Sequence, residues 1–180
     1  MSMNPNGSPQ PAQQPPPLAR DREGRIEPAS LADIIQWFLD RDTRVNMVRH
    51  PRVAEVFRWK QEAARAAGED VFEFDTAEDR FAVGVMQALM QNPSEPELHG
   101  WIGQLLNALE DASKTNEEVA QAYRLDTTGT TSRLAESEKI PTARGREVYL
   151  TCCWLETLCT AEVRVLGWLY QELYGKPFAP

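Results

Sequence analysis

The sequence predicts an all-α protein, and three observations lead to that prediction. From Ala29 to Tyr174 the apolar residues recur at the three- and four-residue spacing of amphipathic helices. Ser, Thr or Asp residues followed by acidic residues precede several of these stretches, a pattern typical of helix N-termini. No alternating run of apolar and polar residues is long enough for a sheet, and the chain has no internal repeat.

Composition limits the function classes. The chain has 180 residues, a net charge of −8 and 42% hydrophobic residues, enough for a core without disulfides. An acidic chain is a poor general coat for nucleic acid, although a local basic face remains compatible with sequence-specific binding. No run of about 18 uncharged apolar residues predicts a membrane span. The polar, Pro-rich start and the three cysteines (Cys152, Cys153, Cys159) favour free thiols in the cytoplasm.

Residues 1–28 form a segment of different composition. They contain seven of the thirteen prolines and no aromatic residue. Such a segment buries too little to offset its ordering entropy, so we expect a disordered tail. We expect this tail to serve as a linker or a solubilising segment, and the alternative is a polyproline ligand at Pro15-Pro16-Pro17.

Residues 29–93 are expected to form an N-terminal helical subdomain. A first stripe runs from Leu31 to Phe38, and Pro51 suits the first turn of the next helix. A capping-box pattern at 75–78 opens a third helix, which ends near Asn92. The segment from Arg41 to Arg65 contains seven basic and three acidic residues. This excess of positive charge indicates either a solvated helix face or a contact for DNA or an acidic partner.

Residues 94–158 are expected to form a second helical unit. Ser94 to Glu97 match a capping box before the clearest stripe of the chain, Leu98 to Leu109. A further box at 115–118 predicts a new short helix that ends at Tyr123. Residues 144–174 are apolar and helical, with a break expected near Cys159, which leaves 159–180 as a separate C-terminal packing or dimerisation helix.

Thr115 to Leu134, TNEEVAQAYRLDTTGTTSRL, resembles the helix-turn-helix of the Cro/repressor-like (XRE) family. That pattern runs T-Q-E-E-V-A, a turn, and a Ser/Thr-rich helix ending in S-R-L. The helix at 98–109 resembles the family's first helix, and residues 146–153 take the place of its last. The resemblance covers about residues 98–158 and implies a repressor-like five-helix domain.

The resemblance also implies a function. The second helix of such a motif lies in the major groove, so the chain is expected to be a DNA-binding transcriptional regulator without an enzymatic step. Arg124 takes the place of the turn glycine, Leu125 points into the core, and the recognition helix spans Thr127 to Arg133. The implied DNA contacts are Asn116, Thr127, Thr128, Thr130, Thr131 and Arg133.

Local charge keeps an alternative open. The segment from Ser94 to Cys153 contains ten acidic and six basic residues. The alternative is therefore a protein-interaction adaptor on a degenerate helix-turn-helix scaffold, and a helical sensor or enzyme for a small ligand is a third class. The apolar C-terminal helix either packs on the N-terminal helices or forms a homodimer seam.

Catalytic and metal sites are not indicated. His50 and His99 are far apart in sequence, and each suits a surface or cap position. Three cysteines without a nearby histidine do not make a zinc site, which takes four ligands. We expect no catalytic residue, no metal and no cofactor.

Overall fold

The computed structural model describes residues 14–69, 76–127 and 132–180. In these ranges the protein is all-helical, as predicted, and an isolated bridge between Arg20 and Ile26 is the only β pairing. The elements are α1 (Pro28–Arg41), α2 (Thr43–Asn46), the 3₁₀ turn η1 (Met47–Arg49), α3 (Pro51–Ala66), α4 (Ala77–Met90), α5 (Glu95–Tyr123), α6 (Arg133–Ser137) and α7 (Ala143–Tyr174).

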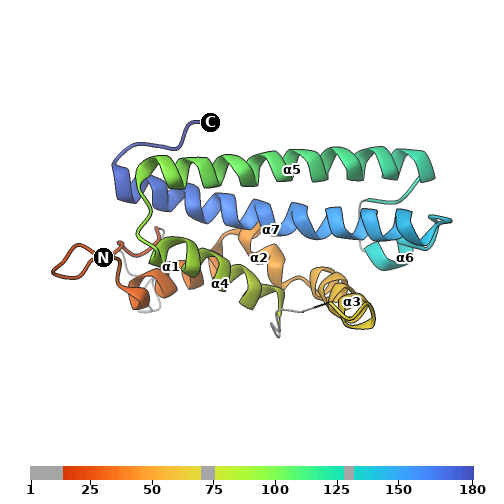
Figure 1. Cartoon of the computed structure of the whole chain (residues 1–180), viewed down its shortest axis with the longest axis horizontal. Coiled ribbons are helices and arrows are strands. Elements are labelled where there is room, and N and C mark those ends of the chain that lie inside the picture. The colour runs from red at the N-terminus through yellow and green to blue at the C-terminus, as the bar shows by residue number, and fades with distance from the viewer. Residues whose placement is uncertain (1–13, 70–75, 128–131) are drawn as a thin grey trace, which may run out of the picture.

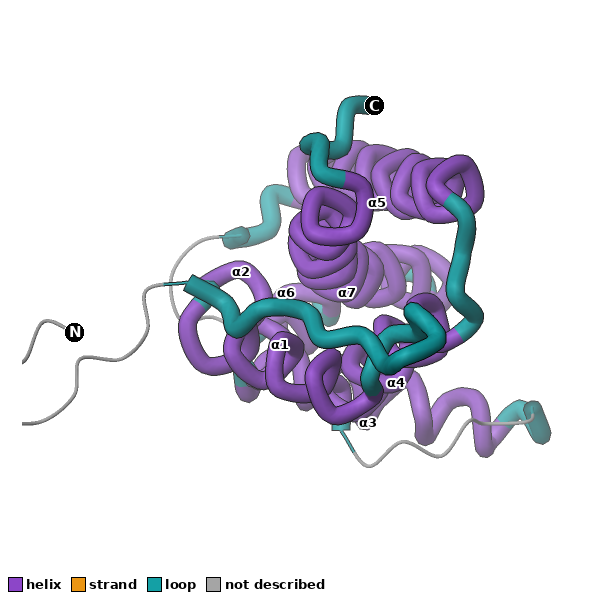
Figure 2. The backbone as a smooth tube through the Cα atoms, turned by 90° about the vertical axis from the view of Figure 1, so that its left-hand side faces the viewer, coloured by secondary structure: helices purple, strands orange, loops and turns teal. Residues whose placement is uncertain are grey.

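α7 lies at the centre of the fold. It runs antiparallel to α5 along nearly the whole length of both helices, and α1 to α4 cover its other side (Figures 1 and 2). α7 packs against α2, α3, α4, α5, α6 and η1. Of the two predicted alternatives for the C-terminal apolar surface, the structure shows packing on the N-terminal helices.

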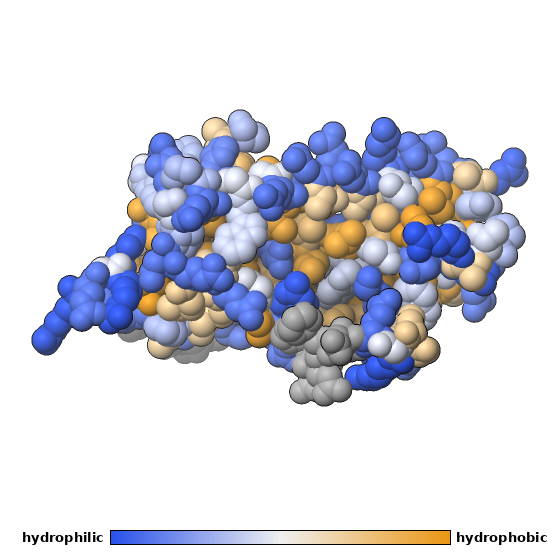
Figure 3. Space-filling model, in the orientation of Figure 1, coloured by the Kyte–Doolittle hydropathy of each residue, from blue (hydrophilic) through white to orange (hydrophobic). Residues whose placement is uncertain are grey.

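One hydrophobic core joins the two predicted helical units. It contains buried side chains from α1 to α5 and from α7, among them Leu31, Phe81, Ile102 and Leu169. Hydrophilic residues line the outer side of α5, and apolar atoms show between α5 and the helices beneath it (Figure 3). The pattern is that of a helix that buries one stripe and solvates the other.

Several helix starts follow the sequence signals. Ser94 and Glu97 form the predicted capping box, in which Ser94 Oγ accepts from the Glu97 amide and the Glu97 carboxylate accepts from the Ser94 amide. Pro51 lies in the first turn of α3, as predicted. Thr142 caps α7 by accepting a hydrogen bond from the Gly145 amide at 3.0 Å.

Two predictions about segment ends are wrong. Of the tail predicted to be disordered, residues 14–27 pack on the protein, because Ile26 enters the core at 4% exposure and Ser30 Oγ accepts from the Ala19 amide; residues 1–13 lie outside the described ranges. The break predicted near Cys159 is absent, and the expected separate helix at 159–180 is the second half of α7. Continuous contact with α5 explains why α7 stays straight through that point.

Candidate functional site

The predicted first helix of the motif is not a separate helix. α5 runs without interruption from Glu95 to Tyr123, so Thr115 lies in its interior and caps nothing. The segment between Leu109 and Thr115 contains neither glycine nor proline, and Ala112 within it is buried at 3% exposure. Packing of one continuous stripe on α7 outweighs the local helix-start pattern.

Asn116 is turned into the protein rather than toward solvent. Its side chain is buried, and its Nδ2 donates a hydrogen bond to Glu156 Oε2 at 2.7 Å. The Cys153 thiol lies 3.8 Å from Asn116 Oδ1. The prediction that Asn116 faces a DNA phosphate is wrong for this structure, because both ends of its amide have internal partners.

The predicted recognition helix is only partly described. Thr127 has no regular secondary structure, and α6 begins at Arg133, so these two residues do not share a helix. Thr128, Thr130 and Thr131 lie outside the described residues. Arg124 has the left-handed φ of 53° expected at the turn position, and Leu125 is buried in the core as predicted.

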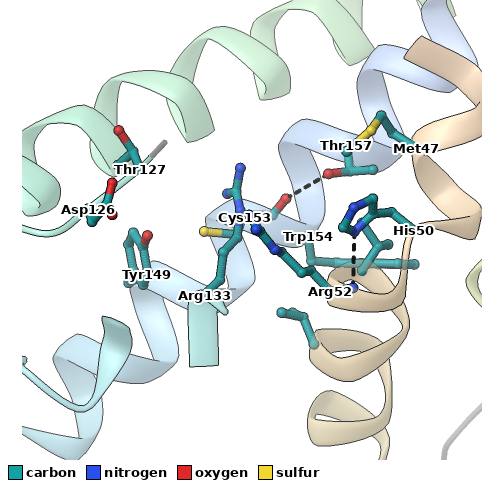
Figure 4. Close-up of a pocket in the computed structure, with 12 residues that line it drawn as sticks. Met47, His50, Arg52, Asp126, Thr127, Arg133, Tyr149, Cys153, Trp154 and Thr157 are labelled. Carbon is teal, nitrogen blue, oxygen red and sulfur yellow. Dashed lines mark hydrogen bonds between the residues drawn. The ribbon is translucent and has the colours of Figure 1, made fainter. Parts of the chain in front are cut away.

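Thr127 and Arg133 border a cavity of about 380 Å³ (Figure 4). α7 supplies Tyr149, Cys153, Trp154 and Thr157, and the segment before and within α3 supplies a second wall of Met47, His50, Arg52, Val53 and Val56. In Figure 4, Arg133 from α6 and Arg52 from α3 are directed into the space between Tyr149 and His50. Asp126 completes the lining.

Short hydrogen bonds hold the elements around this cavity. Ser132, the N-cap of α6, donates from Oγ to Glu55 Oε2 at 2.6 Å and so ties α6 to α3. The Asp126 amide donates to Glu136 Oε2 at 2.6 Å, which fixes the chain before the cavity to α6. His50 Nδ1 accepts from the Arg52 amide at 3.2 Å and caps α3, as its predicted cap role implies.

A second cavity, of about 580 Å³, adjoins the first. It shares Thr127, Arg133 and Tyr149 with the first, and its further lining comes mainly from α5: Ser113, Asn116, Glu117, Ala120 and Gln121, with Leu125 and with Glu156 of α7. Arg133 therefore borders both cavities, together with Thr127 and Tyr149.

Arg133 forms a loose ion pair with Glu156. Its Nη1 lies 3.6 Å from Glu156 Oε2, beyond the usual hydrogen-bond length, and its side chain is 39% exposed. Arg133 thus lines both cavities, and the Glu156 carboxylate beside it already accepts a hydrogen bond from Asn116.

The potential nucleophiles in the first cavity are not activated. Burial raises the pKa of the Cys153 thiol, although Arg133 partly offsets this effect, and burial also raises the pKa of the Tyr149 hydroxyl. Both groups are therefore neutral near pH 7, whereas a cysteine nucleophile requires a thiolate. This arrangement suits binding better than covalent chemistry.

Sequence reasoning named Thr127 and Arg133 but not the opposite wall. Arg52 was part of the basic segment, and nothing local connects it with Arg133, which is 81 positions away in the chain. All three cysteines are free thiols, as predicted. Within the described ranges no group of His, Cys, Asp and Glu side chains is arranged to hold a metal ion.

Comparison of the chain with protein-family models, with curated proteins and with solved structures gives no match. Among the helices of residues 14–69, 76–127 and 132–180, none has the length and apolar content that a bilayer crossing requires.

Proposed function

We propose that this protein is a ligand-binding helical module whose first cavity takes a small organic anion. The observation that carries the proposal is the position of Arg133, which lines the cavity together with Arg52 and whose ion pair with Glu156, at 3.6 Å, is longer than a hydrogen bond. A guanidinium in a partly desolvated site gains most from a carboxylate or phosphate that accepts two parallel hydrogen bonds.

The shape and lining of the cavity support this proposal. Its volume of about 380 Å³ lies in the range of small-molecule sites. Val53, Val56 and Trp154 supply apolar surface, and polar groups come from both walls, with Arg52 from α3 and Arg133 from α6. An apolar wall with a few convergent polar groups holds the body of a ligand and fixes the orientation of its charged end.

Thermal unfolding tests the proposal. Ethylphosphonate and succinate are added to the full chain at increasing concentration, and the melting temperature is recorded for the wild type, Arg133→Gln and Arg144→Gln. Arg144 is the matched control, because it is 79% exposed at the start of α7 and does not line this cavity. A ligand that binds only the native state raises the melting temperature with concentration.

We expect the rise with at least one probe in the wild type and in Arg144→Gln, and its loss in Arg133→Gln. An equal rise of the melting temperature in all three proteins would mean that the probe binds at a site other than the first cavity. No rise with either probe at concentrations far above those of ordinary ligand binding would contradict the proposal.

DNA binding is a second candidate, and the surface of α3 is the observation that favours it. The C-terminal half of α3 projects from the bundle (Figure 2) and carries exposed Arg58 and Arg65, while Arg44 is exposed in α2. Fluorescence anisotropy with duplex DNA at two salt concentrations tests it, because phosphate contacts give steeply salt-dependent affinity. Absence of binding at low salt by the folded protein would exclude this candidate.

A further inference from the structure

The two cavities that meet at Arg133 have opposite charge. The first is lined by His50, Arg52 and Arg133, and Asp126 is the acidic residue in its described lining. Beyond Arg133, the second cavity is lined by the carboxylates of Glu117 and Glu156 and by polar groups such as the Asn116 amide. The charge of the lining therefore changes across the shared residues, from basic around Arg52 and Arg133 to acidic around Glu117 and Glu156.

We infer that the ligand is a short zwitterion, with its anionic end in the first cavity at Arg133 and Arg52 and an ammonium end in the second cavity at Glu156. This inference rests on the proposed function, since it assumes that the first cavity binds an anion. It adds the chemical class of the ligand and a recognition role for Glu156.

The geometry at the wall carries the inference. Glu156 Oε2 and Arg133 Nη1 are 3.6 Å apart, too far for a hydrogen bond but close enough for one small ligand to reach both groups. Asn116 Nδ2 holds Glu156 Oε2 at 2.7 Å, so the carboxylate is oriented while its other oxygen keeps acceptor capacity. The Glu156 side chain is 25% exposed and lines the second cavity.

The positions of Arg133 and Glu156 favour a ligand that carries both charges. A simple anion would approach Arg133 with Glu156 nearby, and two negative groups at this range repel each other. A ligand that also carries an ammonium group removes that repulsion and gains a charge-assisted hydrogen bond to Glu156. Discrimination between a zwitterion and an anion of the same length therefore depends on Glu156.

Two probes of matched length test this directly. Isothermal titration calorimetry compares 2-aminoethylphosphonate with ethylphosphonate on the full chain, for the wild type, Glu156→Gln and Glu118→Gln. In Glu156→Gln the side-chain amide oxygen still accepts from Asn116, so the α5–α7 contact is kept while the charge is removed. Glu118 is the control, since it is exposed on α5 and lines neither cavity.

The wild type and Glu118→Gln are expected to bind the amino probe about tenfold more tightly than ethylphosphonate, which corresponds to one charge-assisted hydrogen bond. Glu156→Gln is expected to bind both probes with about equal affinity. Equal affinities in the wild type, or a preference that survives in Glu156→Gln with an unchanged circular dichroism spectrum, would overturn the inference and leave the proposed function standing. Failure of both probes to bind the wild type would overturn the proposed function and the inference with it.

Discussion

Asn116 of α5 donates a hydrogen bond from Nδ2 to Glu156 Oε2 of α7 at 2.7 Å, inside the interface of the two longest helices. The pair lies where a helix-turn-helix would place the start of a new helix. Instead, a polar side chain occupies a position of the buried stripe of α5. A single Asn at such a position is a known device for fixing the register of two packed helices.

Removal of this amide is expected to destabilise the protein. Asn116→Ala leaves the Glu156 carboxylate without its donor in a partly buried interface, at a cost of about 1–3 kcal/mol. Urea unfolding measures the loss. Asn107→Ala, at an exposed position of the same helix, should change the free energy of unfolding by less than about 0.5 kcal/mol. Equal losses in the two variants would show that the hydrogen bond contributes nothing.

The helices that sequence reasoning predicted best are those whose signals are local. The stripe from Leu31 to Phe38 and the capping box at Ser94 depend on residues within one or two turns, and both are found. Helix periodicity and cap chemistry act at that range, so one sequence suffices to predict them.

The predicted helix start at Thr115 is wrong because a contact between residues far apart in sequence determines the structure there. The segment at Thr115 has the composition of a helix N-terminus, yet every residue of it is also compatible with a helix interior. The apolar stripe of α5 continues through this point in alternating steps of four and three, with Asn116 as its one polar member: Leu98, Ile102, Leu105, Leu109, Ala112, Asn116, Val119. Such a repeat indicates one helix packed along a partner, here α7.

For the same reason, the sequence predicted only one side of the candidate site. Arg133 and Thr127 could be predicted as site residues because both belong to the segment that resembles a helix-turn-helix. His50 and Arg52 reach the cavity only because α3 packs against α6 and α7, and no local pattern encodes that contact.

Gly145 is expected to resist substitution although it lies in a helix. A Cβ at this position would lie 2.8 Å from Ile140 Cγ2 and 2.8 Å from Thr142 Oγ1, the oxygen that caps α7. Gly145→Ala should therefore lower the free energy of unfolding by about 1–3 kcal/mol, despite the better helix propensity of alanine.

Gly100 provides the matched case for that test. It lies in α5, and a Cβ there would meet nothing within 4 Å. Gly100→Ala should stabilise the protein by up to about 1 kcal/mol in the same urea titration. A stabilising effect of both substitutions would refute the steric argument for Gly145.

Asp42 should make stability sensitive to acid. Its carboxylate accepts from Arg164 Nε at 2.9 Å and caps α2 through the amides of Arg44 and Val45. Burial raises the pKa of Asp42, but the Arg164 guanidinium and these amides outweigh burial and lower it overall. The stabilisation is therefore complete above the unfolded-state pKa of 3.8 and is lost as the pH falls through the lower folded-state value.

The corresponding variant is Asp42→Asn, which keeps a cap oxygen and removes the charge. It should lose about 1–2 kcal/mol of stability at neutral pH and less at about pH 3, as followed by urea unfolding at both values. Asp33→Asn, at an exposed position of α1, should show no such dependence. If Asp42→Asn lowered the free energy of unfolding equally at both pH values, the charge of Asp42 would not be the cause of its stabilising effect.

Glu162 should give the opposite pH dependence. Its side chain lies between α7 and α4, the residue is 9% exposed, and burial raises its pKa to about 7, with Arg80 only partly offsetting that effect. Because the folded-state pKa exceeds the unfolded value of 4.5, the native protein holds the proton more tightly. Its stabilisation is present below 4.5 and is lost as the pH rises through about 7.

Urea unfolding between about pH 5 and about pH 8 measures this dependence. The wild type should lose about 2–3 kcal/mol over that range from this group, since each pH unit of displacement corresponds to about 1.4 kcal/mol. Glu162→Gln carries no titrating proton and should lose that slope, while Glu172→Gln, exposed on the same helix, should keep it. Parallel pH profiles for the wild type and Glu162→Gln would mean that the buried carboxyl stays ionised, with Arg80 supplying the full compensation for its charge.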